Sequence, residues 1–347
     1  MTIVQLLRAV VATEALVLVL LLAALAATAS YAAARRRRDR ARLARVMGSQ
    51  AGGGTKTPAA ELSHRFAQLP RRLRLATLAD LTGPVHGTAS ELVLRQAGSA
   101  DLIGEAAGWC RSRRWWRRLR AVRTLSLLGE GADTVPALFA DPHPQVRAAA
   151  AAWAVDHPDP ALADRLVDML DDPMLRCRFA AKAALLRIGR RGVRPLVRYL
   201  TAPDVHRLAS ALEVAAGLAE PALLAPGLLH CRSPDPSVRS RAAEVVAAIG
   251  GAEAVASLAE LLRDPDVTVR ATAARGLGAL GHWPAAPAVA DALADPSWEV
   301  RRHAALALRR MGPAGYLYLR RALRQADPYA ADMARQVLDL PYLASTP

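Results

Sequence analysis

Three scarcities limit what this 347-residue chain can be. Aromatic residues make up only 4% of it although hydrophobic residues make up 52%, so its apolar content is mostly Ala, Leu and Val. β-Sandwiches and barrels draw on aromatic and β-branched residues, so this composition favours closely packed helices. The three cysteines, Cys110, Cys177 and Cys231, lie far apart without a CxxC pair, which excludes a disulfide framework and a cysteine-based zinc ribbon.

Lysine is scarce as well, since Lys56 and Lys182 are the only lysines among 46 basic residues. We interpret the excess of Arg and Ala as the base composition of a GC-rich bacterium. The formal charge is +15, but residues 121–347 carry 26 basic and 24 acidic residues, so the excess lies in the first 120 residues. A solenoid that binds nucleic acid is expected to carry a basic stripe along its body. The nearly neutral body makes nucleic-acid binding the weaker alternative.

Residues 15–34 carry no charge and could form a helix about 30 Å long, the thickness of a bilayer core. A basic run follows directly and includes Arg35, Arg36, Arg37, Arg38 and Arg40. A cleaved signal peptide with its site near residues 27–29 is the alternative, but signal peptides carry their charge before a shorter apolar region. We therefore expect residues 1–34 to be a single-pass anchor in a bacterial cytoplasmic membrane. The positive-inside rule places the N-terminus outside and the rest of the chain in the cytoplasm.

Two segments join this anchor to the rest of the chain. Residues 35–58 read as a basic stop-transfer segment and a Gly-rich linker. Binding of anionic head groups by the basic run is a second interpretation. Residues 59–112 carry short amphipathic patterns broken by Gly and Pro, so we predict a helical cap there.

The strongest signal is an internal repeat. An acidic residue, usually followed by Pro and an apolar-Arg pair, recurs at positions 141, 172, 204, 235, 264, 295 and 327. Spacings of 29 to 32 residues over seven copies predict a solenoid. The Asp is expected to cap a helix whose first residue is the Pro. A Gly at 189, 250, 281 or 312 is expected to end that helix, and a shorter second helix follows.

The copy at residues 203–207 departs from this pattern. It has Pro before Asp and lacks the usual Val-Arg pair. We therefore expect irregular stacking at that point of the solenoid.

The pattern D-P-x(1–3)-V-R-x-x-A-A-x-x-L-G resembles HEAT repeats of the short bacterial, PBS-lyase-like type, over about residues 113–340. The resemblance implies an all-α fold, an α-solenoid of about seven helix pairs, here preceded by the single transmembrane helix. It also implies a ladder of hydrogen bonds between Asp and Arg of successive units. The ladder and capping residues carried over are Asp141, Arg147, Asp172, Arg178, Asp235, Arg239, Asp264, Arg270, Asp295 and Arg301. We expect these residues to be structural rather than ligand-binding.

Enzymes with such repeats offer a further alternative. Iron-dependent HEAT hydroxylases hold their metal with His-Glu pairs, but none of the eight histidines here is followed by Glu. Bilin lyases share the repeat type, but the membrane anchor argues against that role, and the sequence has no phosphate-binding loop or GxSxG motif. Cys177 occupies an apolar position of its repeat and is predicted to be buried. We expect no catalytic residue, cofactor or metal, with a lyase-like enzyme subunit as the alternative.

Residues 111–123 combine seven arginines with two tryptophans. Three interpretations stay open: contact with anionic head groups, a protein interface, or an end cap of the solenoid with solvated arginines. The candidate interface residues are Arg113, Arg114, Trp115, Trp116, Arg117 and Arg118. Other aromatics at helical spacing are expected in the core rather than on a binding surface. They are Trp153, Phe179, Trp298, Tyr316, Tyr318 and Tyr329.

The expected function is that of a membrane-tethered scaffold or adaptor without catalytic activity. Its partner would be a protein, such as a membrane enzyme or a transport complex, bound at the cytoplasmic face. An extended repeat surface offers many weak contacts at once, and a tether raises the effective concentration of a membrane partner.

Overall fold

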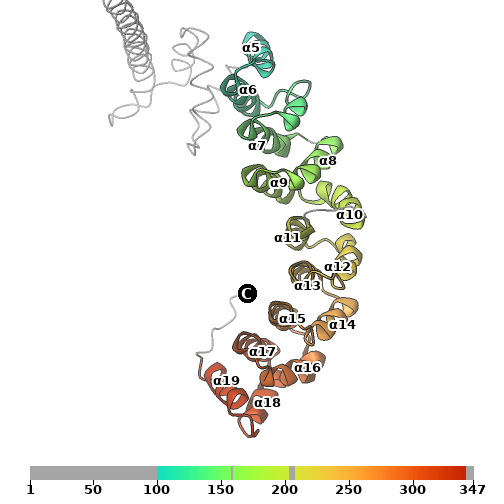
Figure 1. Ribbon diagram of the computed structural model, residues 1–347, viewed down its shortest axis with the longest axis vertical. Coiled ribbons are helices and arrows are strands. Elements are labelled where there is room, and N and C mark those ends of the chain that lie inside the picture. The colour runs from blue at the N-terminus through green and yellow to red at the C-terminus, as the bar shows by residue number, and fades with distance from the viewer. Residues whose placement is uncertain (1–99, 158, 203–207, 341–347) are drawn as a thin grey trace, which may run out of the picture. The chain divides into compact units, whose positions relative to one another are not determined.

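The computed structural model describes residues 100–157, 159–202 and 208–340. These residues form α-helices and short 3-10 helices and include no strand, so the all-α class is confirmed for them (Figure 1). The predicted anchor (1–34), the basic linker (35–58) with Arg35, Arg36, Arg37, Arg38 and Arg40, most of the predicted cap and the 203–207 copy lie outside the described residues. Within the described ranges, no helix has the length and apolar character needed to cross a bilayer.

The chain separates into two compact units, Met1–Gly131 and Ala132–Pro347. In the first unit, α5 (Ala100–Cys110) packs against α6 (Trp115–Leu128). Leu102 of α5 and Leu125 of α6 are fully buried. The helix α6, which the sequence analysis included in the solenoid, falls in this first unit.

The second unit alternates first helices with second helices that are mostly shorter. The first helices are α7 (Pro144–Trp153), α9 (Leu175–Ile188), α11 (Leu208–Leu218), α13 (Pro236–Ile249), α15 (Val267–Leu280), α17 (Trp298–Arg310) and α19 (Pro328–Leu338). The second helices are α8 (Pro160–Asp168), α10 (Val193–Thr201), α12 (Leu224–His230), α14 (Ala252–Leu261), α16 (Ala286–Asp291) and α18 (Pro313–Ala322). Each first helix packs against the next first helix, and the second helices form the other layer (Figure 1). This arrangement is an α-solenoid of helix pairs.

Short 3-10 turns connect or extend these helices. They are η2 (Val135–Ala140), η3 (Ala154–Asp156), η4 (Met169–Asp171), η5 (Gly189–Gly192), η6 (Pro221–Leu223), η7 (Trp283–Ala285) and η8 (Ala292–Ala294).

Small residues set the distance between neighbouring first helices. Ala273 and Ala274 of α15 and Ala304 and Ala305 of α17 are fully buried. A Cβ added at Gly278 would lie 2.6 Å from the Cα of Ala307, so the two backbones approach too closely there for any side chain. Small residues at these contacts allow the close approach of the two helices.

The predicted helix-ending glycines have left-handed backbones. Gly189, Gly250, Gly281 and Gly312 have φ angles of 60°, 79°, 62° and 70°. A residue with a Cβ would be strained at these angles, so Gly suits the ends of α9, α13, α15 and α17, where the chain turns to the second helix.

The predicted role of the Asp-Pro pairs is wrong for α7, α9, α15 and α17. These helices begin two residues after the Pro, so neither the Asp nor the Pro is where the prediction placed it. The prediction is correct for α13 and α19, where Asp235 and Asp327 cap the helix and Pro is its first residue. The turns described next explain the difference.

Candidate functional site

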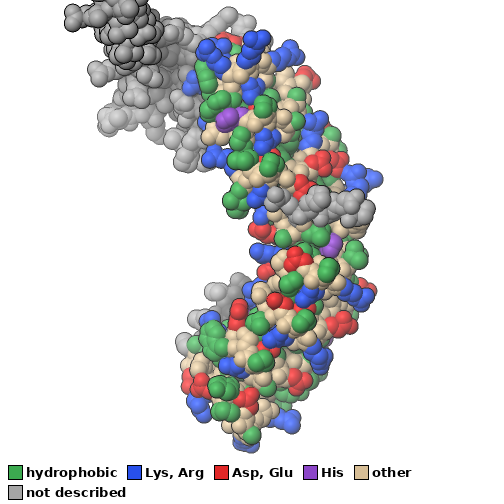
Figure 2. Space-filling view, viewed as in Figure 1, with side chains coloured by type: hydrophobic (Ala, Val, Ile, Leu, Met, Phe, Trp, Pro, Cys, Tyr) green, Lys and Arg blue, Asp and Glu red, His purple; other side chains and the backbone are tan. Residues whose placement is uncertain are grey.

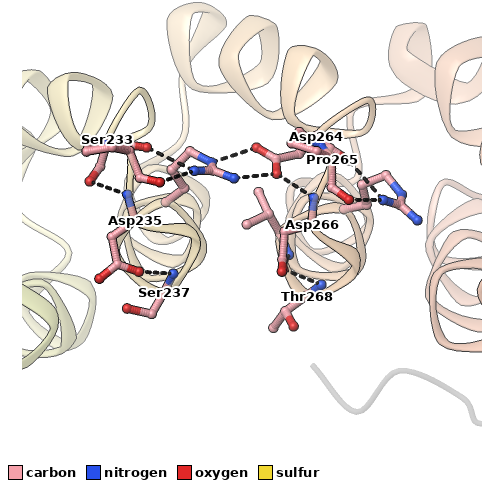
Figure 3. A network of polar contacts seen from close by, with 11 residues as sticks. Ser233, Asp235, Ser237, Asp264, Pro265, Asp266 and Thr268 are labelled. Atoms are coloured by element: carbon pink, nitrogen blue, oxygen red, sulfur yellow. Dashed lines mark hydrogen bonds and ion pairs between the residues drawn. The ribbon is translucent and has the colours of Figure 1, made fainter.

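In the turn ahead of α15, two aspartate side chains in succession accept hydrogen bonds from backbone N–H groups. Asp264 Oδ1 accepts a hydrogen bond from the backbone N–H of Asp266 at 2.9 Å (Figure 3). Asp266 then caps the helix by accepting from the N–H of Thr268 at 2.8 Å. The first aspartate therefore orders the turn, and the second satisfies the helix end.

The same first step occurs ahead of three other helices. Their aspartates accept from the backbone N–H two residues later at 2.8 Å: Asp141 from His143, Asp172 from Met174, and Asp295 from Ser297. Each of these aspartates directly precedes a Pro. Pro has no backbone N–H to donate, and its fixed φ angle suits a turn.

Arginine side chains join successive turns into a ladder. Arg239 donates from Nε to Asp264 Oδ2 at 2.7 Å and from Nη2 to Asp264 Oδ1 at 2.7 Å. Its Nη1 also binds the carbonyl oxygens of Ser233 and Pro234 at 3.0 and 3.1 Å. Each such arginine therefore binds carbonyl oxygens of its own turn and the carboxylate of the next turn, 25 residues further along the chain.

The bidentate pair recurs along the second unit. Arg147 binds Asp172 at 2.7 and 3.0 Å, and Arg270 binds Asp295 at 2.7 and 3.0 Å. The two side chains of each pair are almost completely buried. This is the carboxylate-matched fork geometry of arginine, which a lysine could not reproduce.

The ladder carboxylates stay ionised. Burial raises the pKa of Asp264, but hydrogen bonds from Arg239 and from the N–H of Asp266 outweigh it and hold that pKa below its usual value. The pKa values of Asp172 and Asp295 are lowered in the same way, by Arg147 and Arg270. A buried pair of this kind costs stability when one partner is removed, because the other charge is then left alone.

Asp235 does not lie on the ladder, which corrects the sequence analysis. It caps α13 by accepting from the N–H of Ser237 at 2.8 Å, and Ser233 takes the ladder position (Figure 3). Ser233 Oγ accepts from the N–H of Asp235 at 3.3 Å. The reason is spacing: Asp264 stands six residues before Arg270, whereas Asp235 stands only four before Arg239.

Two predicted ladder arginines lack a described carboxylate. Arg178 binds the carbonyl oxygens of Asp172 and Pro173 at 2.9 and 3.0 Å, and the next turn along the chain lies outside the described residues. Arg301 binds the carbonyl oxygens of Asp295 and Pro296 at 2.8 and 3.0 Å. Its Nε is buried and has no hydrogen-bond partner among the described residues.

Apolar side chains are exposed along the same edge of the second unit. Val267, Trp298 and Tyr329, at the first turns of α15, α17 and α19, are 38%, 55% and 67% exposed. They recur every 31 residues on adjacent helices, and we call these three residues the apolar edge. The guanidinium groups of Arg302 and Arg301 lie 5.4 and 5.0 Å from the rings of Trp298 and Tyr329.

The apolar edge overturns part of the core prediction. Trp153 is buried as expected, and Tyr316 and Tyr318 are half-buried. Phe179, Trp298 and Tyr329 are exposed. Trp298 and Tyr329 lie in the first turns of α17 and α19, and Phe179 lies in the second turn of α9. Helical periodicity alone does not separate these positions from core positions.

The Arg/Trp segment occupies the start of α6 in the first unit. Trp115 and Trp116 are 39% and 42% exposed. The Arg117 guanidinium lies 5.3 Å from the ring of Trp116 and 5.9 Å from that of Trp109, and Arg114 lies 5.9 Å from Trp116.

The other two candidate interface residues are Arg113 and Arg118. Arg113 is exposed, and Arg118 donates to the carbonyl oxygen of Ser112 at 2.8 Å. An end cap with solvated arginines stays a prediction beside the other two interpretations of this segment. Stacked arginines on exposed rings suit a surface that binds a protein or anionic head groups.

The thiols and the metal-binding residue types offer little chemistry. Burial raises the pKa of Cys177 and Cys231, so both thiols are protonated at neutral pH. Within residues 100–157, 159–202 and 208–340, no cluster of His, Cys, Asp and Glu could hold a metal ion.

Comparison with known families and structures gives the following. Residues 224–309 and 258–339 match the family described as HEAT repeats. The structure of Kap95p bound to RanGDP has 14% identity and a TM-score of 0.50, with 81% of this chain and 50% of that chain covered. Human deoxyhypusine hydroxylase with glycerol has 24% identity, a TM-score of 0.30 and coverages of 73% and 98%. The CpcE–CpcF complex of phycocyanin lyase from Nostoc sp. has 19% identity, a TM-score of 0.32 and coverages of 74% and 96%.

These similarities concern the fold alone. No curated protein sequence matches the chain, and the chain spans half the length of Kap95p. The family match, the paired helices and the turn-to-turn arginine ladder agree with one another. The part of the second unit at residues 224–339 therefore consists of HEAT repeats.

Proposed function

We propose that this chain is a scaffold or adaptor without catalytic activity, which binds a protein partner along the apolar edge. The observation that carries the proposal is the exposure of Val267, Trp298 and Tyr329 on three adjacent helices. Aromatic side chains beside arginines are enriched at the energetic centres of protein interfaces. Kap95p, which has the same fold, binds the protein RanGDP.

The charges around the apolar edge favour a protein over a nucleic acid. Arg301 and Arg302 lie in the first two turns of α17, which also holds Glu299. Asp295 lies in the turn before α17, and Asp266 directly precedes α15. Acidic groups so close to the contact surface would repel a phosphate backbone, which needs a run of basic residues. Figure 2 shows acidic and basic side chains interspersed over the second unit, without a continuous basic stripe on the face in view.

The proposal includes a membrane tether. The uncharged residues 15–34 and the arginines after them support a single-pass anchor in a bacterial cytoplasmic membrane, with the repeats in the cytoplasm. The partner would then be a membrane enzyme or a transport complex. A tether on the same membrane raises the effective concentration, so weak contacts along the edge would suffice.

The interface experiment is cross-linking and pull-down from membranes with the full chain and two variants. We expect Trp298→Ala combined with Tyr329→Ala to lose most of the captured partner, because both exposed rings are removed. The matched control is Trp283→Ala in η7, an exposed Trp away from the apolar edge. Equal capture by all three proteins would contradict the proposal.

The tether experiment compares the full chain with a version lacking residues 1–46. The shortened chain should leave the membrane fraction and capture far less partner. Recovery of a mature form outside the cell without its first residues would instead show a signal peptide.

A further inference from the structure

Among the described residues, Arg301, the last arginine of the ladder, has no carboxylate to bind. In the three complete pairs, the aspartate follows its arginine by 25 residues. The residue 25 positions after Arg301 is Ala326, and the residue two positions before the cap Asp327 is Gln325. Both are exposed and neither carries a charge, so the fork that grips an aspartate elsewhere faces no aspartate here.

The fork of Arg301 is nonetheless held as in the complete pairs. Its Nη1 binds the carbonyl oxygens of Asp295 and Pro296, as that of Arg270 binds those of Asp264 and Pro265. The residue is only 9% exposed, and Nε has no hydrogen-bond partner among the described residues. A buried donor without an acceptor is costly, so the site gains free energy from any group that supplies one.

We propose that Arg301 is a binding site for the side-chain carboxylate of an aspartate in the partner polypeptide. The inference rests on the proposed function, because the ligand is a residue of the bound protein. The guanidinium fork matches a carboxylate through two parallel N–H···O bonds, as the three complete pairs of this chain demonstrate. An aspartate from the partner would bind the fork as the aspartate of the following turn does in the three complete pairs.

The rings beside Arg301 explain why a polypeptide is the expected ligand rather than a small carboxylate. Tyr329 lies over the guanidinium, and Trp298 belongs to the same first turn of α17. The residues before and after a bound aspartate would contact these exposed rings. Nε is shielded in this conformation, so binding requires the Tyr329 ring to turn aside. That ring is largely exposed, and its backbone stays anchored because its N–H donates to Asp327 at 2.9 Å.

The probe is a blocked peptide, acetyl-Ala-Asp-Pro-Ser-amide, which copies residues 294–297 of the turn that Arg270 grips. Its binding to the full chain is measured by calorimetry or ligand-observed NMR against the same peptide with Asn in place of Asp. We expect the Asp peptide to bind about tenfold more tightly or better, since a hydrogen-bonded charge is lost in the Asn form. Equal binding of the two peptides would overturn the proposal. Acetate binding as tightly as the Asp peptide would overturn the assignment to a polypeptide.

Variants that leave Arg301 in place give the sharpest test. Ala326→Asp and Gln325→Asp each place a carboxylate of this chain near Arg301. Position 326 has the 25-residue distance from the arginine that the complete pairs have. Position 325 stands two residues before the helix cap, as Asp264 does. At least one should raise the melting temperature and abolish Asp-peptide binding, and retention of binding by both would overturn the proposal. Arg301→Lys keeps the charge without the fork and should weaken the preference for Asp over Asn. Trp283→Ala should keep it.

This test is separable from that of the proposed function. Equal binding of the Asp and Asn peptides by the unchanged chain, with normal partner capture, would overturn only the carboxylate site. Partner capture that is indifferent to Trp298 and Tyr329 would sink the proposed function, whatever the peptide does.

Discussion

The turns ahead of α13 and α15 contain the same dipeptide, Asp-Pro, and use it differently. Asp264 is buried, binds Arg239 and orders a turn two residues before the helix cap. Asp235 is exposed and is itself the cap of α13. The number of residues between the aspartate and the arginine therefore decides whether the aspartate joins the ladder or caps the helix. Six residues place the carboxylate on the ladder, and four place it on the helix end.

The two turns are also physically connected. Arg239 binds the carbonyl oxygens of Ser233 and Pro234 in the first turn and the carboxylate of Asp264 in the second (Figure 3). The exposed Asp235 acts only within its own repeat, because it accepts a hydrogen bond from the first turn of α13. The buried aspartate acts between repeats, so the two positions should respond differently to mutation.

Arg239→Ala should have the largest effect, because it breaks the connection between the two turns. It leaves Asp264 buried without its partner, which costs about 3–5 kcal/mol. Amide hydrogen exchange in α13 and α15 measures this locally, without assuming that a solenoid unfolds in one step. The matched control is Arg241→Ala on the same helix, whose exposed pair with Glu244 contributes under about 1 kcal/mol. Equal losses for the two variants would contradict a special role of the ladder.

Exchanging each aspartate for asparagine isolates the charge. Asp264→Asn should cost about 1.5–3 kcal/mol, because an amide cannot accept two bonds from the Arg239 fork. Asp235→Asn should change little, because Asn caps a helix as well as Asp does. Thermal and urea unfolding of both variants test this difference. A larger loss at Asp235 would reverse the assignment of the two roles.

Acid should weaken the ladder. Burial raises the pKa of Asp264, but the bonds from Arg239 and Asp266 lower it further, so its folded pKa lies below its unfolded pKa of about 3.9. Such a group stabilises the fold fully above the unfolded pKa and loses this contribution as pH falls toward the folded pKa. The contribution of Asp264 to stability should therefore be constant from neutral pH to about pH 5 and fall below about pH 4. Asp264→Asn should show a smaller fall, and an unchanged acid profile would contradict this prediction.

The sequence carried enough information for the fold and for most of the ladder. The 31-residue period, the left-handed glycines and the pairing of Arg239 with Asp264 or Arg270 with Asp295 are all confirmed in the second unit. The glycines are predictable because few residue types meet the backbone requirement of a positive φ, and the Arg–Asp pairs because the resemblance to HEAT repeats implies them. The solenoid follows from repetition of those requirements.

Three features were not predictable from the same pattern. Asp235 was misplaced because both kinds of turn show Asp-Pro followed by an apolar-Arg pair, and only a two-residue difference separates them. Trp298 and Tyr329 were expected in the core because helical spacing does not tell a first turn from a packed face. The open fork of Arg301 depends on the absence of an aspartate after it, and an absence becomes visible only when the complete pairs are known.

Ser233→Ala should have the smallest effect of the changes considered. Ser233 occupies the ladder position ahead of α13 but offers only a hydroxyl, which accepts a single bond of 3.3 Å from the N–H of Asp235. Its loss should cost about 0.5 kcal/mol, the low end for a neutral hydrogen bond.

The matched control for Ser233→Ala is Ser297→Ala ahead of α17. There Asp295 orders the turn and the serine side chain makes no capping bond, so its removal should change nothing. A loss at Ser297 as large as at Ser233, by thermal unfolding, would mean that the hydroxyl does not replace the missing carboxylate. The turn ahead of α13 would then be held by Arg239 alone, which grips its carbonyl oxygens whatever residue stands at position 233.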